Sequence, residues 1–473
     1  MLFNSFEFFV FLPIVFLLYW FVVNKSLVAQ NILILVASYF FYSWWNWKFL
    51  GLLLLSTLID YFFGFLVATS DKKKKKIYLW LSIFNNLLVL GIFKYYNFFV
   101  VEMQQLLDVI GFHIHPYLIK IALPVGISFY TFHGMSYVLD IYKGKVTPEK
   151  SFVSYATFVS FFPLLVAGPI ERAGHLLPQI NQPRVFRYSQ AVEGLRLILW
   201  GLFKKIVIAD SLAPVVSEIF DNPHAYSGST LILGAIYFSF QIYGDFSGYT
   251  DIAIGTAKLF GFELLTNFRF PYFSRDLAEF WRRWHISLST WFRDYIYIPL
   301  GGSKNGKYLA VRNVMIIFLL SGFWHGASWN FIVWGGIHAL GFLPLLLLRR
   351  NRIHISHIVA HKESFPVFKE FIGMLLTFSF VTFAWIFFRS ASLTSGIDYI
   401  SHIGTGFFQV PVLKSFLFIY VLPLLLIDWK LRHDERVLIV SGNKVVRYLF
   451  YLLLTFVILY HSGNNAEFIY FQF

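Results

Sequence analysis

Long apolar runs recur along the chain, and polar loops separate them. The runs cover residues 6–23, 31–45, 49–69, 77–93, 118–140, 311–327, 329–348, 368–388, 413–429 and 446–462. A helix that crosses the roughly 30 Å hydrocarbon layer of a bilayer needs about 20 apolar residues. The pattern therefore predicts an all-α, polytopic membrane protein with about ten to twelve transmembrane helices.

The middle of the chain, residues 150–300, follows this pattern less regularly. Three segments there combine apolar residues with Gly, Pro and charges: FFPLLVAGPIER, QIYGDFSGYTDIAIG and LGGSKNGK. Non-helical backbone at membrane depth persists only where protein buries it or water reaches it. These segments therefore predict broken or re-entrant helices around a cavity.

The domain organisation that we predict is a single membrane domain over residues 1–473. It divides into N-terminal spans at 1–145, a core at 150–345 and C-terminal spans at 365–473. The first apolar run lacks a basic leader and a small-residue cleavage site, so we expect it to be a retained first span.

The composition supports a membrane location. Only 14% of the residues are charged, against about 25% in soluble domains, so much of the apolar surface must face lipid. The net charge of +14 then reflects basic loops that orient the spans, and not a nucleic-acid site. Placing Lys72–Lys76, Arg349, Arg350 and Arg352 on the cytoplasmic side puts both termini outside.

The chain contains no cysteine. This excludes thiol catalysis, Cys-ligated zinc, iron–sulfur clusters and disulfides. His354, His357 and His361 have helical spacing, but they lie in a polar loop without Cys or Asp, so we predict no metal site.

His325 is the first candidate for chemistry, because no charged residue lies between Arg312 and Arg349. If the segment is helical, His325 lies roughly 20 Å from Arg312, well within the membrane. A neutral imidazole there is suited to general-base work. A structural histidine bonded to a carbonyl is an equally good interpretation of the bare sequence.

A second candidate is the segment RDLAEFWRRWHISLSTWFRDY. A helix over residues 281–295 would place four side chains on one face: Trp281, Arg282, His285 and Ser289. One interpretation is an interfacial helix with snorkelling arginines. The other is a basic, aromatic-lined wall that receives an anionic acyl carrier or headgroup.

Two buried carboxylates form a third candidate, Asp245 and Asp251. Such groups need partners, so they could orient a histidine, ligate a cation or form structural ion pairs. Gly244 and Gly248, four residues apart, can equally indicate close helix packing. In the segment PLLVAGPIER, we expect Glu171 and Arg172 to anchor a loop on the inner face.

Several long strings resemble one known family. They are GPIER, QIYGDFSGYTDIAIG, NFRFPYFSRDLAEFWRRWHISLSTWFRDYIYIPLGG and SGFWHGASWNFIVWG, with the closing FIYFQF. They are similar to the bacterial branch of the membrane-bound O-acyltransferases, nearest to the membrane subunits of alginate and peptidoglycan O-acetylation. The teichoic acid D-alanylation transporter is a more distant relative. The resemblance spans most of the chain and is densest over residues 160–340.

This resemblance implies that His325 is the family's near-invariant membrane histidine and His285 its second signature histidine. It also implies a ring of spans around a funnel or tunnel, through which donor and acceptor reach the histidine from opposite sides. The location that follows is the bacterial cytoplasmic (inner) membrane.

The function expected from the resemblance is O-acyl transfer from a cytoplasmic acyl thioester, most simply acetyl-CoA, with no bound cofactor. His325 would take the proton of the incoming hydroxyl. Asn330, the Trp324 N–H or nearby backbone amides would stabilise the oxyanion. His285, supported by Arg282 and by Asp245 or Asp251, would line the donor path or orient the acyl carbonyl.

The partners that the resemblance implies are an acyl-CoA or acyl-carrier donor, membrane lipid, a polysaccharide acceptor and an extracytoplasmic SGNH-like acetyltransferase. Transfer through an acyl-enzyme serine lacks a distinctive motif, so direct transfer is preferred. A transporter or flippase in which His285 and His325 gate a pathway is the main alternative, and a structural scaffold is the third.

Overall fold

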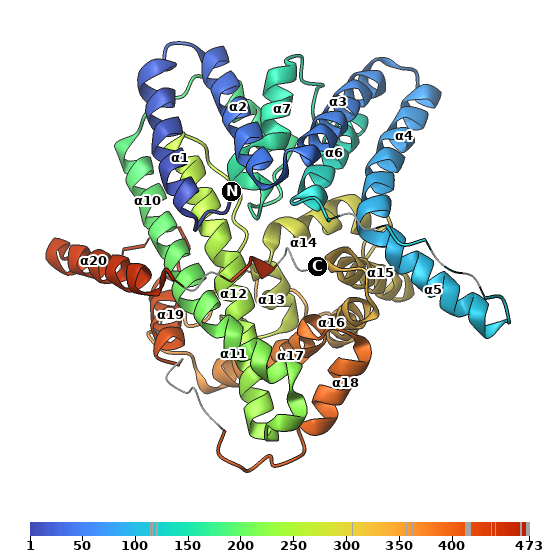
Figure 1. The fold of residues 1–473 in the computed structure, drawn as a ribbon, viewed down its shortest axis with the longest axis vertical. Coiled ribbons are helices and arrows are strands. Elements are labelled where there is room, and N and C mark those ends of the chain that lie inside the picture. Colours follow the sequence, from blue (N-terminus) through green and yellow to red (C-terminus); the bar gives the residue numbers. More distant parts are fainter. Residues whose placement is uncertain are drawn as a thin grey trace. The chain divides into compact units, whose positions relative to one another are not determined.

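The regular structure of the protein is helical throughout the residues that its computed structural model describes (Figure 1). These are residues 1–113, 115, 117–119, 122–304, 306–355, 357–361, 363–411, 418–436, 438–439, 441–463 and 466–469. The all-α prediction is confirmed. The first five residues of the predicted run 413–429 and the last four of FIYFQF lie outside the described residues.

The chain forms two compact units, and α10 (Tyr188–Leu202) and α12 (Gly228–Leu259) contribute to both. Unit 1 comprises Met1–Gly194 and Ala253–Leu265. Its other helices are α1 (Phe6–Leu17), η1 (Leu18–Val22), α2 (Leu27–Asn46), α3 (Lys48–Thr69), α4 (Lys72–Leu90), η2 (Gly91–Tyr95), α5 (Tyr96–Val109), α6 (Ile127–Tyr142), α7 (Phe152–Ser160), α8 (Phe162–Leu165) and α9 (Ala173–Ile180). The single domain over 1–473 stays a prediction.

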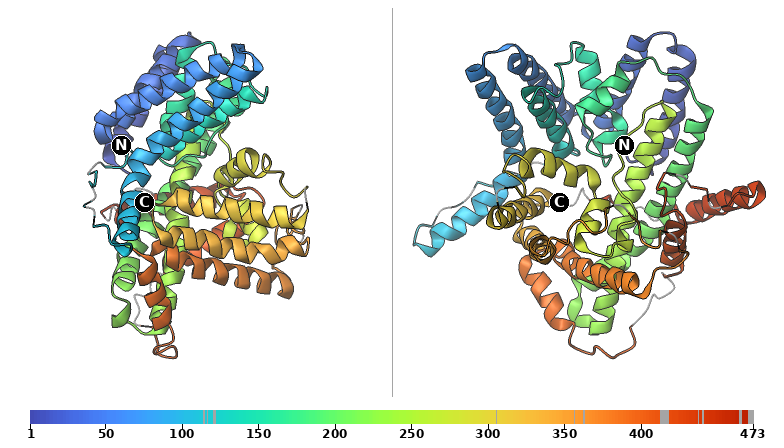
Figure 2. Two further views of the ribbon diagram at one scale, coloured as in Figure 1. Left: turned by 90° about the vertical axis from the view of Figure 1, so that its right-hand side faces the viewer. Right: turned by 180° about the vertical axis from the view of Figure 1, so that it is seen from behind.

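Unit 2 comprises Leu195–Ile252 and Thr266–Phe473 and holds both candidate histidines. Its remaining helices are η3 (Phe203–Ala209), α11 (Asp210–Asp221), η4 (Pro223–Ala225), η5 (Pro271–Phe273), α13 (Leu277–Arg283), α14 (Ile286–Phe292), η6 (Arg293–Tyr297), α15 (Lys307–His325), α16 (Trp329–Leu347), α17 (Phe368–Arg389), α18 (Leu393–His402), α19 (Phe418–Lys430) and α20 (Lys444–His461). Figure 2 shows α15, α16 and α17 stacked side by side.

Seven helical segments in the described chain are long and apolar enough to cross a membrane. They are Leu27–Asn46, Lys48–Thr69, Lys72–Val109, Lys307–His325, Trp329–Leu347, Phe368–Arg389 and Lys444–His461. Other predicted runs form shorter helices, such as Phe6–Val22. In the predicted run 118–140, the helix α6 begins only at Ile127. The protein is therefore multi-pass, with fewer full-length helices than the apolar runs suggest.

The irregular middle is confirmed in part. In FFPLLVAGPIER, α8 is only four residues long, and residues 168–172 are not helical. The fully buried Glu171 carboxylate accepts hydrogen bonds there from His175 at 2.8 Å and from the Leu265 backbone N–H at 2.6 Å. Glu171 thus anchors its loop, as the sequence suggests.

The prediction of a break in QIYGDFSGYTDIAIG is wrong, because this segment lies inside the continuous 32-residue helix α12. Its glycines serve packing instead. A Cβ on Gly244 would lie 2.9 Å from the Lys204 carbonyl oxygen, and one on Gly248 would lie 2.7 Å from the Gly201 carbonyl oxygen. Small residues at this spacing let helix backbones approach closely without interrupting either helix.

Helices α15 and α16 pack against each other most tightly at two glycines. A Cβ on Gly322 would lie 2.2 Å from the Phe331 carbonyl oxygen, and one on Gly335 would lie 2.3 Å from the Phe318 carbonyl oxygen. Real Cβ contacts are longer than this, so neither site accepts a side chain without moving a backbone. The contact fixes the end of α15, where His325 lies, against α16.

Replacing Gly335 by alanine should therefore destabilise the protein. We expect G335A to cost about 1–3 kcal/mol, the usual effect of forcing extra atoms into a packed interior. Thermal unfolding of the detergent-purified protein measures it. Gly336→Ala is the matched control, since its nearest neighbour is a Leu319 methyl carbon at 3.8 Å. Equal melting temperatures for the two variants would contradict the packing argument.

Candidate functional site

His325 is the last residue of α15 and is 4% exposed. Three aromatic rings surround its imidazole, with centroid distances of 4.8 Å to Trp324, 5.1 Å to Trp334 and 5.2 Å to Phe388. Gly326 follows directly, where a Cβ would lie 2.2 Å from the Phe331 ring. The chain therefore turns sharply after the histidine and leaves it enclosed by α15, α16 and α17.

His285 lies at a break between two helices. The predicted continuous helix over 281–295 is wrong, because α13 ends at Arg283 and α14 begins at Ile286. The backbone of His285 is left-handed, with φ of 43°. Such a conformation is strained by about 1–3 kcal/mol for a residue with a side chain, and strain of this kind concentrates at functional sites.

Asn267 orients the His285 ring. The His285 Nδ1 lies 3.1 Å from the Asn267 Oδ1, which also accepts a hydrogen bond from the Ser287 hydroxyl at 2.9 Å. A carbonyl oxygen can only accept, so Nδ1 carries the proton and Nε2 keeps its lone pair. Burial lowers the pKa of His285 to about 3, so the ring is neutral at physiological pH.

The structure brings the two candidate histidines to one aromatic cluster. The Trp324 ring contacts both, at 6.0 Å from His285 and 4.8 Å from His325 between ring centroids. They come from α15 and from the break between α13 and α14, about 40 residues apart in the chain. Sequence spacing alone does not predict this proximity.

The buried aspartates form ion pairs with lysines. Asp245 contacts Lys205 at 2.9 Å and accepts a hydrogen bond from the Ile469 backbone N–H at 2.7 Å, and Asp251 pairs with Lys204. Of the roles left open by the sequence, this geometry favours the structural ion pair. The lysine partners lie in the π-helical turn η3, which packs against α12.

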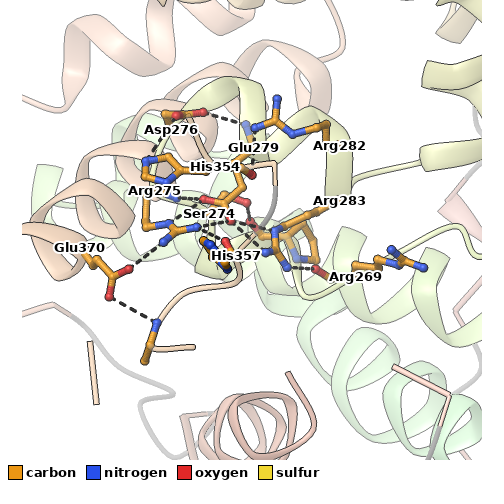
Figure 3. A network of polar contacts seen from close by, with 12 residues as sticks. Arg269, Ser274, Arg275, Asp276, Glu279, Arg282, Arg283, His354, His357 and Glu370 are labelled. Atoms are coloured by element: carbon orange, nitrogen blue, oxygen red, sulfur yellow. Dashed lines mark hydrogen bonds and ion pairs between the residues drawn. The ribbon is translucent and has the colours of Figure 1, made fainter. Parts of the chain in front are cut away.

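Arg282 and its neighbours form a polar network that holds the backbone of Asn351, His354 and His357 (Figure 3). Glu279 is 1% exposed and pairs with Arg275 at 3.0 Å and with Arg283 at 2.8 Å. Arg282 donates to the backbone oxygens of Asn351 at 2.9 Å and His354 at 3.3 Å. These arginines are committed to internal acceptors, so this part of the predicted basic wall is structural.

A cavity of about 710 Å³ lies beside these helices within unit 2. One part of its lining is apolar or aromatic and includes Trp281 and Phe318. Five basic residues, which we call the basic rim, also line it: Arg293, Lys304, Lys307, Arg349 and Arg352. In the described residues the lining contains no Asp or Glu.

The inner part of the cavity approaches His325 along α15. Ser321 lines the cavity and lies four residues before His325 on the same helix, a rise of about 6 Å. A cavity with a basic rim and an apolar interior suits an elongated ligand that has an anionic end and a neutral end.

Asn330 has its amide hydrogens engaged. Its Nδ2 donates to the backbone oxygens of Phe387 at 3.1 Å and Ser390 at 2.7 Å, which ties α16 to the end of α17. An oxyanion would compete with these two carbonyls. The Trp324 ring contacts both histidines, and its role as an oxyanion donor stays a prediction.

Sequence reasoning missed several residues of this region. In the sequence, Asn267 stood out only as part of a segment that resembles the family. The residues of the basic rim come from three separate segments, so their proximity could not be predicted from sequence spacing. His338, fully buried in α16, lies in the same uncharged run as His325, a signal that singles out an intramembrane histidine.

Removing the Glu279 charge should destabilise unit 2. Although burial alone would raise the pKa of Glu279, hydrogen bonds from Arg275 and the charge of Arg283 hold it below its usual value. Breaking a buried pair costs about 3–5 kcal/mol, so we expect E279Q to lower the melting temperature at pH 7. The exposed Glu363→Gln is the control.

The same variant predicts a pH dependence. Because the folded-state pKa is lowered, the stabilisation is fully present above the ordinary Glu pKa of about 4.3 and is lost as pH falls through the folded value. The melting difference between wild type and E279Q should shrink below about pH 4. A difference that is constant from pH 7 to pH 3 would contradict the charge-based account.

Comparison with known proteins finds relatives that cover most of the chain. The chain is 39% identical over 397 residues, 83% of this chain and 76% of the relative, to "Probable alginate O-acetylase AlgI" of Azotobacter vinelandii. It is 35% identical over 427 residues, 84% of this chain and 78% of the relative, to "Peptidoglycan O-acetyltransferase" of Helicobacter pylori. A "Teichoic acid D-alanyltransferase" of Streptococcus thermophilus is 28% identical over 56% of this chain and 68% of that protein.

These relatives are named as an O-acetylase, an O-acetyltransferase and a D-alanyltransferase, so they do not favour the transporter or flippase alternative. The family model for the membrane-bound O-acyltransferases matches residues 39–386, which include the two histidines, α15 and α16. With its multi-pass helical fold, the protein is a membrane O-acyltransferase that belongs to the membrane-bound O-acyltransferase (MBOAT) family.

Proposed function

We propose that the protein transfers an acetyl group from acetyl-CoA to a hydroxyl of a cell-envelope polysaccharide, directly or through a partner protein. The observation that supports this most is the cavity that joins a basic rim to the helical turn before His325. Acetyl-CoA has anionic phosphates at one end and a neutral thioester at the other. The two ends match the two chemistries of the cavity.

In the proposed reaction His325 is the general base. Its unprotonated ring nitrogen takes the proton of the acceptor hydroxyl while the hydroxyl oxygen attacks the thioester carbonyl. The carbon–sulfur bond then breaks, and the imidazolium returns the proton to the leaving thiolate. The products are the O-acetyl ester and free CoA, so atoms and charges balance.

His285 has a separate part in this proposal. Its neutral ring is held by Asn267 and contacts the Trp324 ring. We assign it to orienting the acyl group, and we assign the oxyanion to the Trp324 N–H or to backbone amides at the turn after α15. Fixed donors in a water-excluded site are typically worth several kcal/mol in the transition state, about 10²–10³-fold in rate.

The acceptor side remains part of the proposal. Relatives named for alginate and peptidoglycan O-acetylation support a polysaccharide acceptor. We place the protein in the bacterial cytoplasmic membrane with the basic rim on the cytoplasmic side, where acetyl-CoA is made, and with both termini outside. An extracytoplasmic SGNH-like acetyltransferase then passes the group to the polymer.

The decisive experiment measures O-acetyl ester in the cell envelope with wild type or His325→Ala at matched membrane abundance. We expect H325A to lose at least about 10²-fold of the transfer, the usual contribution of a positioned base. His113→Ala is the control, since that histidine is exposed in a loop. An unchanged O-acetyl ester content with H325A would contradict the assignment of His325 as the general base.

The basic rim predicts a second result. Reversing two of its charges, Lys304→Glu with Lys307→Glu, should raise the KM for acetyl-CoA roughly tenfold at low salt, because attraction becomes repulsion. The kcat should change little, since neither residue lies near His325. Added salt should shrink the effect by screening.

The matched control is Lys369→Glu, an exposed charge outside the cavity lining. Transfer of radiolabelled acetyl from acetyl-CoA in isolated membranes gives both constants. A KM that does not move, or a salt-independent change, would show that the rim does not bind the donor phosphates.

A further inference from the structure

His338 is a third buried histidine of unit 2, two turns inside α16 and 0% exposed. Aromatic rings surround it. Its ring centroid lies 4.9 Å from Trp281 and 5.0 Å from Trp334, and the Phe280 ring is stacked on it at 6.3 Å with an interplanar angle of 4°. Phe318, Phe380 and Trp385 are the other rings of this cage. A histidine is an unexpected occupant of such an apolar site.

The ring nitrogens of the cage residues His338, Trp281 and Trp334 form no hydrogen bonds with one another. Within the described part of the chain, neither ring nitrogen of His338 has a hydrogen-bond partner, and neither does the indole Nε1 of Trp281 or of Trp334. A neutral imidazole has one donor and one acceptor, and each indole has one donor. A buried polar group without a partner costs about 1–3 kcal/mol. Four such atoms in one cage therefore indicate a small polar ligand.

The location of the cage connects it with the site. Trp281 and Phe318 form part of the cavity lining, and both contact His338. On the other side, Trp334 packs against His325 with an interplanar angle of 88°. The cage thus lies between the cavity wall and the proposed general base.

The size of the ligand follows from the same contacts. His338 itself is not part of the cavity lining, because Trp281 and Phe318 cover it. A group of the donor cannot reach its nitrogens without displacing that wall. A water molecule is the smallest polar ligand, and enclosed waters typically have about 2–4 polar partners.

We propose that His338 is a positioning residue for acyl transfer, and that it shares one enclosed water molecule with the indole N–H groups of Trp281 and Trp334. The water accepts hydrogen bonds from both indoles and donates one to the unprotonated nitrogen of His338. Three of the four polar atoms are then satisfied.

The shared water would fix the positions of two tryptophans that border the reaction site. The inference rests on the proposed function, in which the thioester must meet the hydroxyl beside His325. The shared water holds Trp281, which borders the cavity, and Trp334, which borders His325, in one fixed geometry. A misplacement of about 1 Å in such a site can cost about 10²-fold in rate.

The experiment uses full-length protein in isolated membranes, with radiolabelled acetyl-CoA and the endogenous envelope polymer. His338→Phe keeps an aromatic ring but removes both nitrogens. His338→Asn and His338→Gln each restore a polar group near one ring nitrogen. We expect H338F to lower kcat about tenfold or more, with the KM for acetyl-CoA changed by less than about threefold, and one of the two amides to recover part of the loss.

A double-mutant cycle tests the shared water. Trp281→Phe removes one indole N–H and keeps a ring against the cavity. If one water joins the two residues, W281F combined with H338F should lose no more activity than the worse single variant. Phe380→Leu is the matched control, since Phe380 contacts His338 but has no polar atom, and its effect should add to that of H338F.

Several outcomes would overturn the inference. These are an H338F variant with wild-type kcat, a change in KM alone, which indicates direct contact with the donor, and fully additive losses for W281F and H338F. If H338F does not fold, the same cycle with H338Q and W281F decides the question. Failure of the proposed function is distinct, because then wild-type membranes transfer no acetyl group or H325A remains active.

Discussion

The close contact between α15 and α16 is the interaction on which the rest of the site depends. In a membrane the hydrophobic effect contributes little to the association of helices, which depends instead on close packing and on small residues at the contact. Gly322 and Gly335 let the two backbones approach, and each lies against a carbonyl oxygen of the other helix. This contact therefore fixes the position of the histidine at the end of α15 relative to the aromatic residues of α16.

The two histidines are held in different ways. His325 lies at the end of a long helix, where α15, α16 and α17 enclose it. His285 lies in a strained turn, and its ring direction depends on Asn267. One position is set by helix packing and the other by a local hydrogen bond.

Much of the fold could be predicted from the sequence, because apolar runs of sufficient length have few alternatives in a membrane. Each predicted run contains a helix in the described residues, although the one at 118 begins later than predicted, and both histidines stay candidates, one of them from its uncharged surroundings. The break at His285 was not predictable, because every residue from Trp281 to Ser289 is compatible with a helix and only tertiary contacts select the left-handed turn. In α12 a break was predicted where the helix is continuous. Its Gly248 packs against Gly201, and its aspartates Asp245 and Asp251 pair with lysines, so neither residue type interrupts the helix.

The buried charges near η3 bear on how the protein is made. Lys205 contacts Asp210 at 2.6 Å, Asp245 at 2.9 Å and the backbone oxygen of Ala466 at 3.0 Å. A charge at the centre of an inserting helix costs about 2.5–3.5 kcal/mol. The ribosome makes Lys205 some 260 residues before Ala466. Both carboxylates are made within about 40 residues of Lys205, whereas the Ala466 carbonyl follows much later, so this cluster is completed only once the second segment of unit 2 has been made.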